Sequence, residues 1–195
     1  MARGRGPGVA LFLGLARWVM ALPRVIGDDA YGSMPCTRFH FFGDTGHELQ
    51  DYGALKTLQN LPALGLTNDT VSSWLHLGAS ITTFANFANK GAGEGSGVLR
   101  STLQYSTSAL GEAVTAPFAA AGYAPEHTDN TTGGELREIV DNGFAAWGFF
   151  GNFERFHTVF DDATSTSEEL LGPVGTAVGQ AMLNVIFNGS NLSKG

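Results

Sequence analysis

Cysteine is nearly absent from the chain, which contains Cys36 and no second thiol. A single thiol cannot close a disulfide within the chain, so a small fold held together by disulfides is excluded. Basic residues are also scarce: there are 11, and 4 of them precede Asp28, the first of 18 acidic residues. From Asp28 onward the acidic excess repels nucleic acid and anionic lipid, so we expect no nucleic-acid partner.

Several signatures of catalysis are missing as well. The sequence contains no nucleophile elbow, phosphate-binding loop or zinc-protease motif. Charged residues make up only 15% of the 195 residues, whereas 43% are apolar and 27 residues are glycine. This composition is typical of a folded chain with many turns, long enough for one ordinary domain or a small domain with an extension.

Residues 1–27 are predicted to be a signal peptide or another targeting segment. A basic start, MARGRGPG, precedes the short apolar run VALFLGLA, and small residues permit cleavage after Ala21. We therefore expect a secreted protein. An arginine-rich, acid-free start also suits organelle targeting, and the segment would anchor the chain in a membrane only if it is not cleaved.

Acceptor motifs for N-glycosylation agree with secretion. They begin at Asn68, Asn130, Asn188 and Asn191. We expect glycans at Asn130, Asn188 and Asn191, whereas a glycan on Asn68 would crowd the candidate ion site described below.

The character of the sequence changes near residue 105. Between residues 37 and 105, short segments with alternating apolar positions and frequent glycine favour β-strands, interrupted by a short helix that carries Leu55, Leu58 and Leu61 and stops at Pro62. Beyond that, alanine-rich runs and acidic residues behind serine or threonine favour helices. We expect a Greek-key domain at 28–110 and a helical extension with a frayed tail at 111–195.

The hexapeptide NDTVSS, residues 68–73, directly precedes a segment with the alternating pattern of a β-strand. With the following GASITTFANFANKG, and with FHFFGDTGHEL and YGALKTLQNLPALGLTNDTVSS upstream, it resembles the βγ-crystallin Greek-key domain over roughly residues 37–105. The resemblance implies an α+β fold class, namely a β-rich, βγ-crystallin-like Greek-key sandwich with a helical C-terminal extension.

The same resemblance implies a calcium site. In that family the hexapeptide supplies oxygen ligands, which here would be Asp69, Thr70 and Ser72 with Asn68 in support. Calcium prefers six to eight oxygen ligands, and a tight turn of this kind can aim several at one point. The second hexapeptide expected near residues 104–109 retains only its serine, Ser108, so we expect calcium to bind weakly at most.

A second cluster offers a different chemistry. Imidazole and carboxylate groups gather within a dozen positions, and both are suitable ligands for a transition metal. The cluster consists of His40, Asp44, His47, Glu48 and Asp51. If this stretch forms a hairpin, its side chains alternate between two faces, and a solvated corner is the alternative reading.

These patterns together predict a secreted, non-catalytic, βγ-crystallin-like glycoprotein with weak calcium binding. Its role would be structural, stress-related or an interaction of the inhibitor or toxin kind, with an unknown protein or a cell surface as partner. The alternative is a metal-dependent enzyme or metalloprotein that uses the His40 to Asp51 cluster, completed by helices of the carboxyl half.

Overall fold

A computed structural model gives the fold of the chain. It describes residues 6–44, 49–79, 81–87, 95–98, 102–121, 126–128, 134–150, 165–166 and 168–188.

Three consecutive helices form the amino-terminal part. They are α1 (Gly6–Met20), α2 (Leu22–Ile26) and α3 (Asp28–Ser33). The apolar run that predicts a targeting segment lies in α1, whose Leu11 and Leu15 are each only 5% exposed. The targeting role itself stays a prediction, while the structure packs this helix against the rest of the chain.

The leucine-rich connection forms α4 (Tyr52–Asn60) followed by a 3₁₀ turn, η2 (Leu61–Leu64). Pro62 removes a backbone donor and so ends the α-helical hydrogen-bond pattern. Gly65 then adopts a φ of 72°, which closes the turn in a conformation that other residues rarely take. The short helix predicted before Pro62 is therefore confirmed.

Four strands form one mixed sheet in the order β1–β6–β4–β5. They are β1 (Trp74–Leu77), β4 (Thr102–Tyr105), β5 (Glu126–Thr128) and β6 (Ala146–Phe150). β6 runs parallel to β1 and antiparallel to β4, and β5 runs parallel to β4. A separate antiparallel pair consists of β2 (Phe84–Phe87) and β3 (Gly95–Val98).

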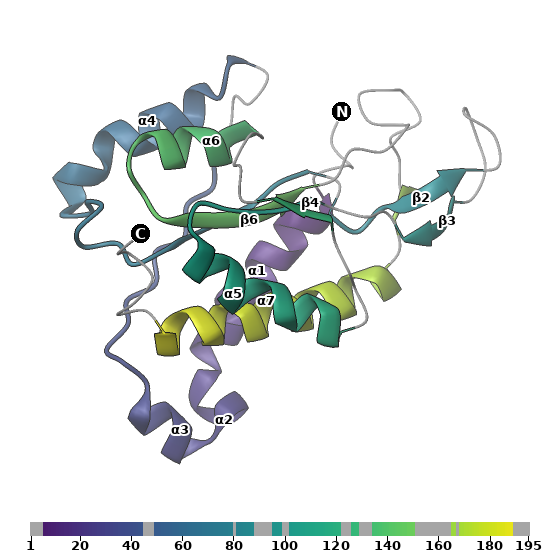
Figure 1. The fold of residues 1–195 in the computed structure, drawn as a ribbon, viewed down its shortest axis with the longest axis horizontal. Coiled ribbons are helices and arrows are strands. Elements are labelled where there is room, and N and C mark those ends of the chain that lie inside the picture. Colours follow the sequence, from purple (N-terminus) through teal and green to yellow (C-terminus); the bar gives the residue numbers. More distant parts are fainter. Residues whose placement is uncertain are drawn as a thin grey trace.

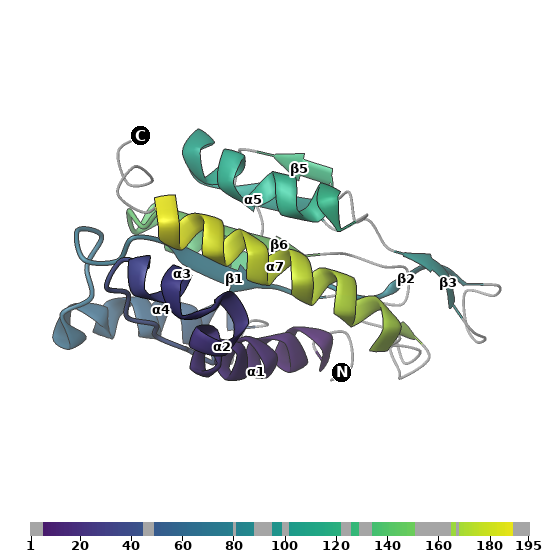
Figure 2. The same ribbon diagram turned by 90° about the horizontal axis from the view of Figure 1, so that it is seen from below.

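Helices cover both faces of the four-stranded sheet. The remaining helices are α5 (Ser108–Ala120), α6 (Gly134–Asp141) and α7 (Glu168–Asn188). In Figure 1, α4 and α6 lie on one side of the sheet and α1, α5 and α7 on the other. Figure 2 shows α1, α5 and α7 along the same face. The result is three layers, helices on sheet on helices.

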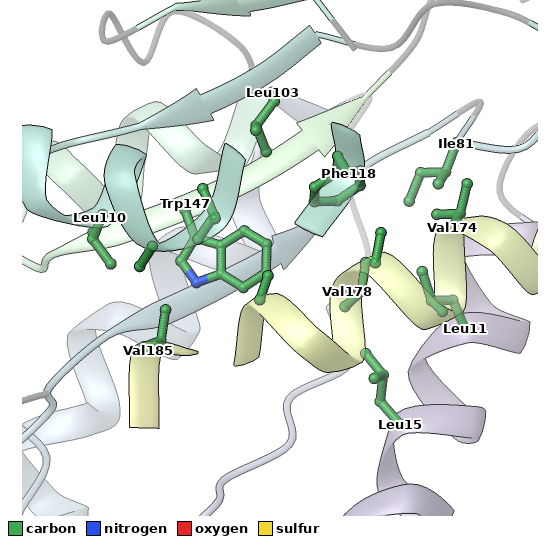
Figure 3. Close-up of a cluster of buried hydrophobic side chains, with 14 residues drawn as sticks. Leu11, Leu15, Ile81, Leu103, Leu110, Phe118, Trp147, Val174, Val178 and Val185 are labelled. Carbon is green, nitrogen blue, oxygen red and sulfur yellow. The ribbon is translucent and has the colours of Figure 1, made fainter. Parts of the chain in front are cut away.

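The larger core fills the space between the sheet and the α1, α5 and α7 layer (Figure 3). Trp147 of β6 is 1% exposed and points toward α7, while Leu103, Leu110, Phe118 and Val178 are completely buried around it. A smaller core on the opposite face joins α4 and α6 to the sheet. Its members are Leu58, Leu61, Leu66, Leu136, Ile139, Phe144 and Ala146.

Two glycines on α7 face α1. A Cβ added at Gly175 would lie 3.6 Å from Leu11, and one added at Gly179 would lie 3.6 Å from the Trp18 ring. Both are ordinary contact distances, so α1 packs directly on this face of α7, and the packing leaves room for a Cβ at either position. Within the described residues, α7 is long and apolar enough to cross a bilayer, but by length and composition alone.

The fold class expected from the βγ-crystallin resemblance is wrong. A Greek-key sandwich is built from antiparallel strands, whereas two of the three strand pairings in the main sheet are parallel. Parallel neighbours need long connections, which helices supply here. In addition, β6 comes from the carboxyl half and lies between β1 and β4, so that half is no mere extension of a β-domain. The helices predicted there, α5, α6 and α7, are present.

Replacing Gly148→Ala should destabilise the protein. Gly148 of β6 lies opposite His76 of β1. A Cβ at this position would collide with the His76 backbone oxygen and lie 3.0 Å from the His76 Cβ. Such crowding in a sheet costs about 1–3 kcal/mol, measurable by urea unfolding.

Gly14→Ala is the matched control, because nothing lies within 4 Å of its added Cβ on α1 and no proline follows it. In that helix the change should stabilise by about 0.5–1 kcal/mol. Equal effects at the two positions would contradict the strand register.

Candidate functional site

A groove of about 1490 Å³ runs along the outer edge of β1. Every residue from Ser72 to Ala79 lines it, together with α1 and the end of α7 from one layer and α4 and the start of α6 from the other. Contributions from both layers place the groove at the edge of the sheet rather than on one face. The segment 35–44 forms a further wall.

A histidine and a glutamate meet on one side of this groove. His76 Nε2 of β1 lies 3.5 Å from Glu135 Oε2 at the start of α6, and each side chain is 16% exposed. The amino end of a helix carries a partial positive charge, which favours a carboxylate at the position of Glu135. Low exposure keeps water from screening the pair, so the two groups interact more strongly than on an open surface.

Two features of the local sequence hold His76 in place. Gly148 lies opposite His76 in the parallel pairing, and its missing side chain leaves room for the imidazole-bearing residue. Two positions before His76, Trp74 stacks on Phe42 with ring centroids 5.6 Å apart and meets Phe144 edge-on at 5.8 Å. These aromatic contacts fix β1 against the segment 35–44 and against the chain that leads into β6.

Two buried polar atoms of the groove lining lack a hydrogen-bond partner within the described part of the chain. They are Ser73 Oγ and His76 Nδ1. A buried polar atom without a partner costs about 1–3 kcal/mol. Native proteins seldom leave such atoms unsatisfied, so a ligand or water that displaced the atoms covering them would gain a hydrogen bond at each.

The predicted calcium ligands lie in a turn between η2 and β1. Thr70 Oγ1 accepts a hydrogen bond from the Thr67 amide at 2.8 Å and donates to the Gly65 carbonyl at 3.0 Å, so this hydroxyl supports the turn. Asn68, Asp69 and Ser72 are exposed. Their role as oxygen ligands stays a prediction, although the Greek-key fold from which it came is not present.

The predicted cluster at residues 40–51 is only partly described, since His47 and Glu48 lie outside the described residues. The exposed His40 ring stacks on Phe42, and Asp44 accepts a hydrogen bond from Thr57 Oγ1 at 2.5 Å. Asp51 is buried at the start of α4, with a φ of 54°. Across all described residues, no three His, Cys, Asp or Glu side chains gather closely enough to hold a metal ion.

Of the predicted glycosylation sites, only Asn188 lies among the described residues. Asn188 is exposed and is the last residue of α7. Asn130 and Asn191 lie outside the described residues. Glycosylation, secretion and an extracellular partner therefore stay predictions.

Sequence patterns did not reveal the His76 and Glu135 pair. The two residues come from different halves of the chain and belong to no motif. The only local signal is a histidine within the apolar strand WLHL, which is more often a buried core residue than a functional one. Only the crossing of β1 by the start of α6 brings the two together.

Comparisons with known proteins give a likeness of fold. No protein-family model matches the chain, and no curated protein matches it in sequence. The solved structure of a zinc aminopeptidase from Bacillus subtilis is similar, with a TM-score of 0.53 and 13% identity. The likeness covers 78% of this chain but only 38% of the aminopeptidase chain. At this identity it concerns the fold alone.

This likeness corrects the expected function as well. The prediction of a non-catalytic, βγ-crystallin-like protein depended on the Greek-key fold, which the mixed sheet and the aminopeptidase likeness overturn. The calcium-binding character drawn from that family loses its support for the same reason.

Removing the Glu135 carboxylate should destabilise the protein because His76 would lose its partner in a poorly solvated place. We expect Glu135→Ala to lower the free energy of unfolding by about 1–3 kcal/mol. Glu138→Ala on the same helix is the control, because Glu138 pairs with Arg137 at 3.5 Å and Arg137 is 52% exposed. Exposed pairs contribute about 0–1 kcal/mol. Equal losses in urea unfolding would contradict the importance of the pair.

Loss of the Thr70 hydroxyl should destabilise the turn before β1. Thr70→Val retains the branched shape but removes both hydrogen bonds, which should cost about 1–2 kcal/mol. Ser72→Ala, at an exposed position of the same turn, should stay within about 0.5 kcal/mol of the parent. Thermal unfolding monitored by circular dichroism measures both, and an unaffected Thr70→Val protein would contradict the structural role of this hydroxyl.

Proposed function

We propose that the chain is a metal-dependent hydrolase of the peptidase type, or part of one. The observation that supports this best is the His76 and Glu135 pair, which lies in a large groove on a fold similar to that of a zinc aminopeptidase. Because the chain corresponds to 38% of the aminopeptidase's length, the activity of a whole enzyme is part of the proposal.

The residues that line the groove fit a metal centre only in part. Imidazole nitrogen and carboxylate oxygen are ligands that zinc takes in proteins, and His76 and Glu135 provide one of each. A catalytic zinc ion usually has three protein ligands. Since the described residues contain no group of three candidate ligands, they do not complete such a centre.

The pair itself can move a proton. With the proton of a neutral imidazole on Nε2, facing the Glu135 carboxylate, the lone pair of His76 lies on Nδ1. Nδ1 is buried and without a partner among the described residues. A water molecule or substrate group that reaches this buried atom could transfer a proton to it, while Glu135 orients the ring. A separation of 3.5 Å is loose, as is common in catalytic pairs before substrate binds.

Hydrolysis of a chromogenic aminoacyl anilide tests the proposal. The purified full chain, supplied with zinc, should release the anilide, and a chelator should abolish the release. His76→Ala should lower the rate at least about 100-fold, the usual contribution of a general base. Lys56→Ala serves as control because Lys56 is exposed on α4 and does not line the groove.

Two results would contradict the proposal. One is the absence of hydrolysis by the zinc-supplied parent protein, judged against a blank. The other is an unchanged rate in His76→Ala, which would remove the pair from the reaction. Elemental analysis of the same samples shows whether zinc is retained.

A further inference from the structure

The outer edge of β1 is open within the part of the chain that the structure describes. β1 pairs with β6 on one side, and no described strand pairs with its other side. An open edge presents backbone N–H and C=O groups that another extended chain can pair with. The groove lies along this edge, so a chain that pairs there would fill the groove.

The groove has an apolar wall on either side of that edge. On the side of α1, Val9 and Leu13 line it and are each 57% exposed, and Phe41 beside them is 40% exposed. On the side of α4 and α6, the rings of Phe42 and Trp74 line it. Successive side chains of an extended chain point to opposite sides, so apolar residues could contact both walls in alternation.

The polar atoms and the charge of the groove indicate which kind of ligand would bind there. The buried Ser73 Oγ and His76 Nδ1, both on the β1 side of the groove, have hydrogen-bonding capacity that no described group uses. Two carboxylates, Asp44 and Glu135, and one guanidinium, Arg38, line the groove, and the whole protein has a net charge of −7. A ligand with hydrogen-bonding amides, apolar side chains and positive charge is complementary to these features.

We propose that an extended peptide with consecutive apolar side chains, which contact the two walls in turn, and with flanking positive charges binds in the groove by adding a strand to the open edge of β1. The inference rests on the proposed peptidase function in that it names the class of substrate. Binding requires only the backbone edge and the two walls, so it can be measured apart from hydrolysis.

A peptide blocked at both ends tests the proposal without turnover. The probe is acetyl-Lys-Leu-Phe-Leu-Phe-Lys-amide, titrated into the full chain by calorimetry in the presence of a chelator. Two derivatives carry N-methyl groups, one on the alternate residues of a single edge and the other on the residues of both edges. Since strand pairing needs one unmethylated edge, the derivative methylated on both edges should bind at least about tenfold more weakly than the derivative methylated on one.

Substitutions in the protein test whether the probe binds in the groove. Leu13→Arg places a charge on the apolar wall at an exposed position and should weaken binding at least about tenfold. Met20→Arg is the matched control: Met20 is 85% exposed on the same helix and does not line the groove. A probe with glutamate in place of both lysines should bind more weakly than the lysine probe.

Three results would overturn the proposal. The first is no binding of the lysine probe, and the second is equal binding of both N-methylated derivatives. The third is a dimer that Leu13→Arg dissociates and that does not bind the probe, because a second copy would then occupy the groove. Binding of the probe without hydrolysis of the anilide would sustain this inference while contradicting the proposed catalytic function.

Discussion

The hydrogen bonding of β6 on both of its edges is the constraint on which the rest of the fold depends. β6 lies between β1 and β4, parallel to one and antiparallel to the other. It also contributes side chains to both cores, since Ala146 faces α4 and α6 whereas Trp147 faces α5 and α7. Removing this strand would separate the two sheet neighbours and both helical layers at once.

The position of β6 also determines the candidate site. Because β6 takes one edge of β1, the other edge faces the groove. Gly148 on β6 leaves space for His76, and the chain before β6 contains α6, which brings Glu135 to the same place. The pair, the groove and the open edge are therefore consequences of one strand insertion rather than independent features.

The sequence predicted local structure better than strand pairing. The leucines before Pro62 indicated α4, and the acidic residues behind Ser165 and Ser167 indicated the start of α7, because these signals depend on neighbours within one or two turns. Alternating apolar residues indicated strands but not their partners. β1 pairs with a strand from the other half of the chain, and no local pattern encodes that contact. The Greek-key prediction failed for this reason.

The candidate site was harder to predict for a related reason. Sequence reasoning favoured residues that are close together in the chain, such as Asn68 to Ser72 and His40 to Asp51. In the structure, Thr70 is used within its own turn and the described members of the second cluster do not converge. His76 and Glu135 meet only through the tertiary fold, so neither the spacing nor the type of either residue could have identified the pair.

The packing of α1 gives the predicted targeting segment a second role. Leu11 and Leu15 belong to the same core as Trp147, and α1 covers the glycine face of α7 at Gly175 and Gly179. Cleavage after Ala21 would expose that face of the long apolar helix α7 and remove Leu11 and Leu15 from the larger core. Cleavage would therefore change the surface of the protein as well as its length, because the apolar face of α7 that α1 covers would become exposed to solvent.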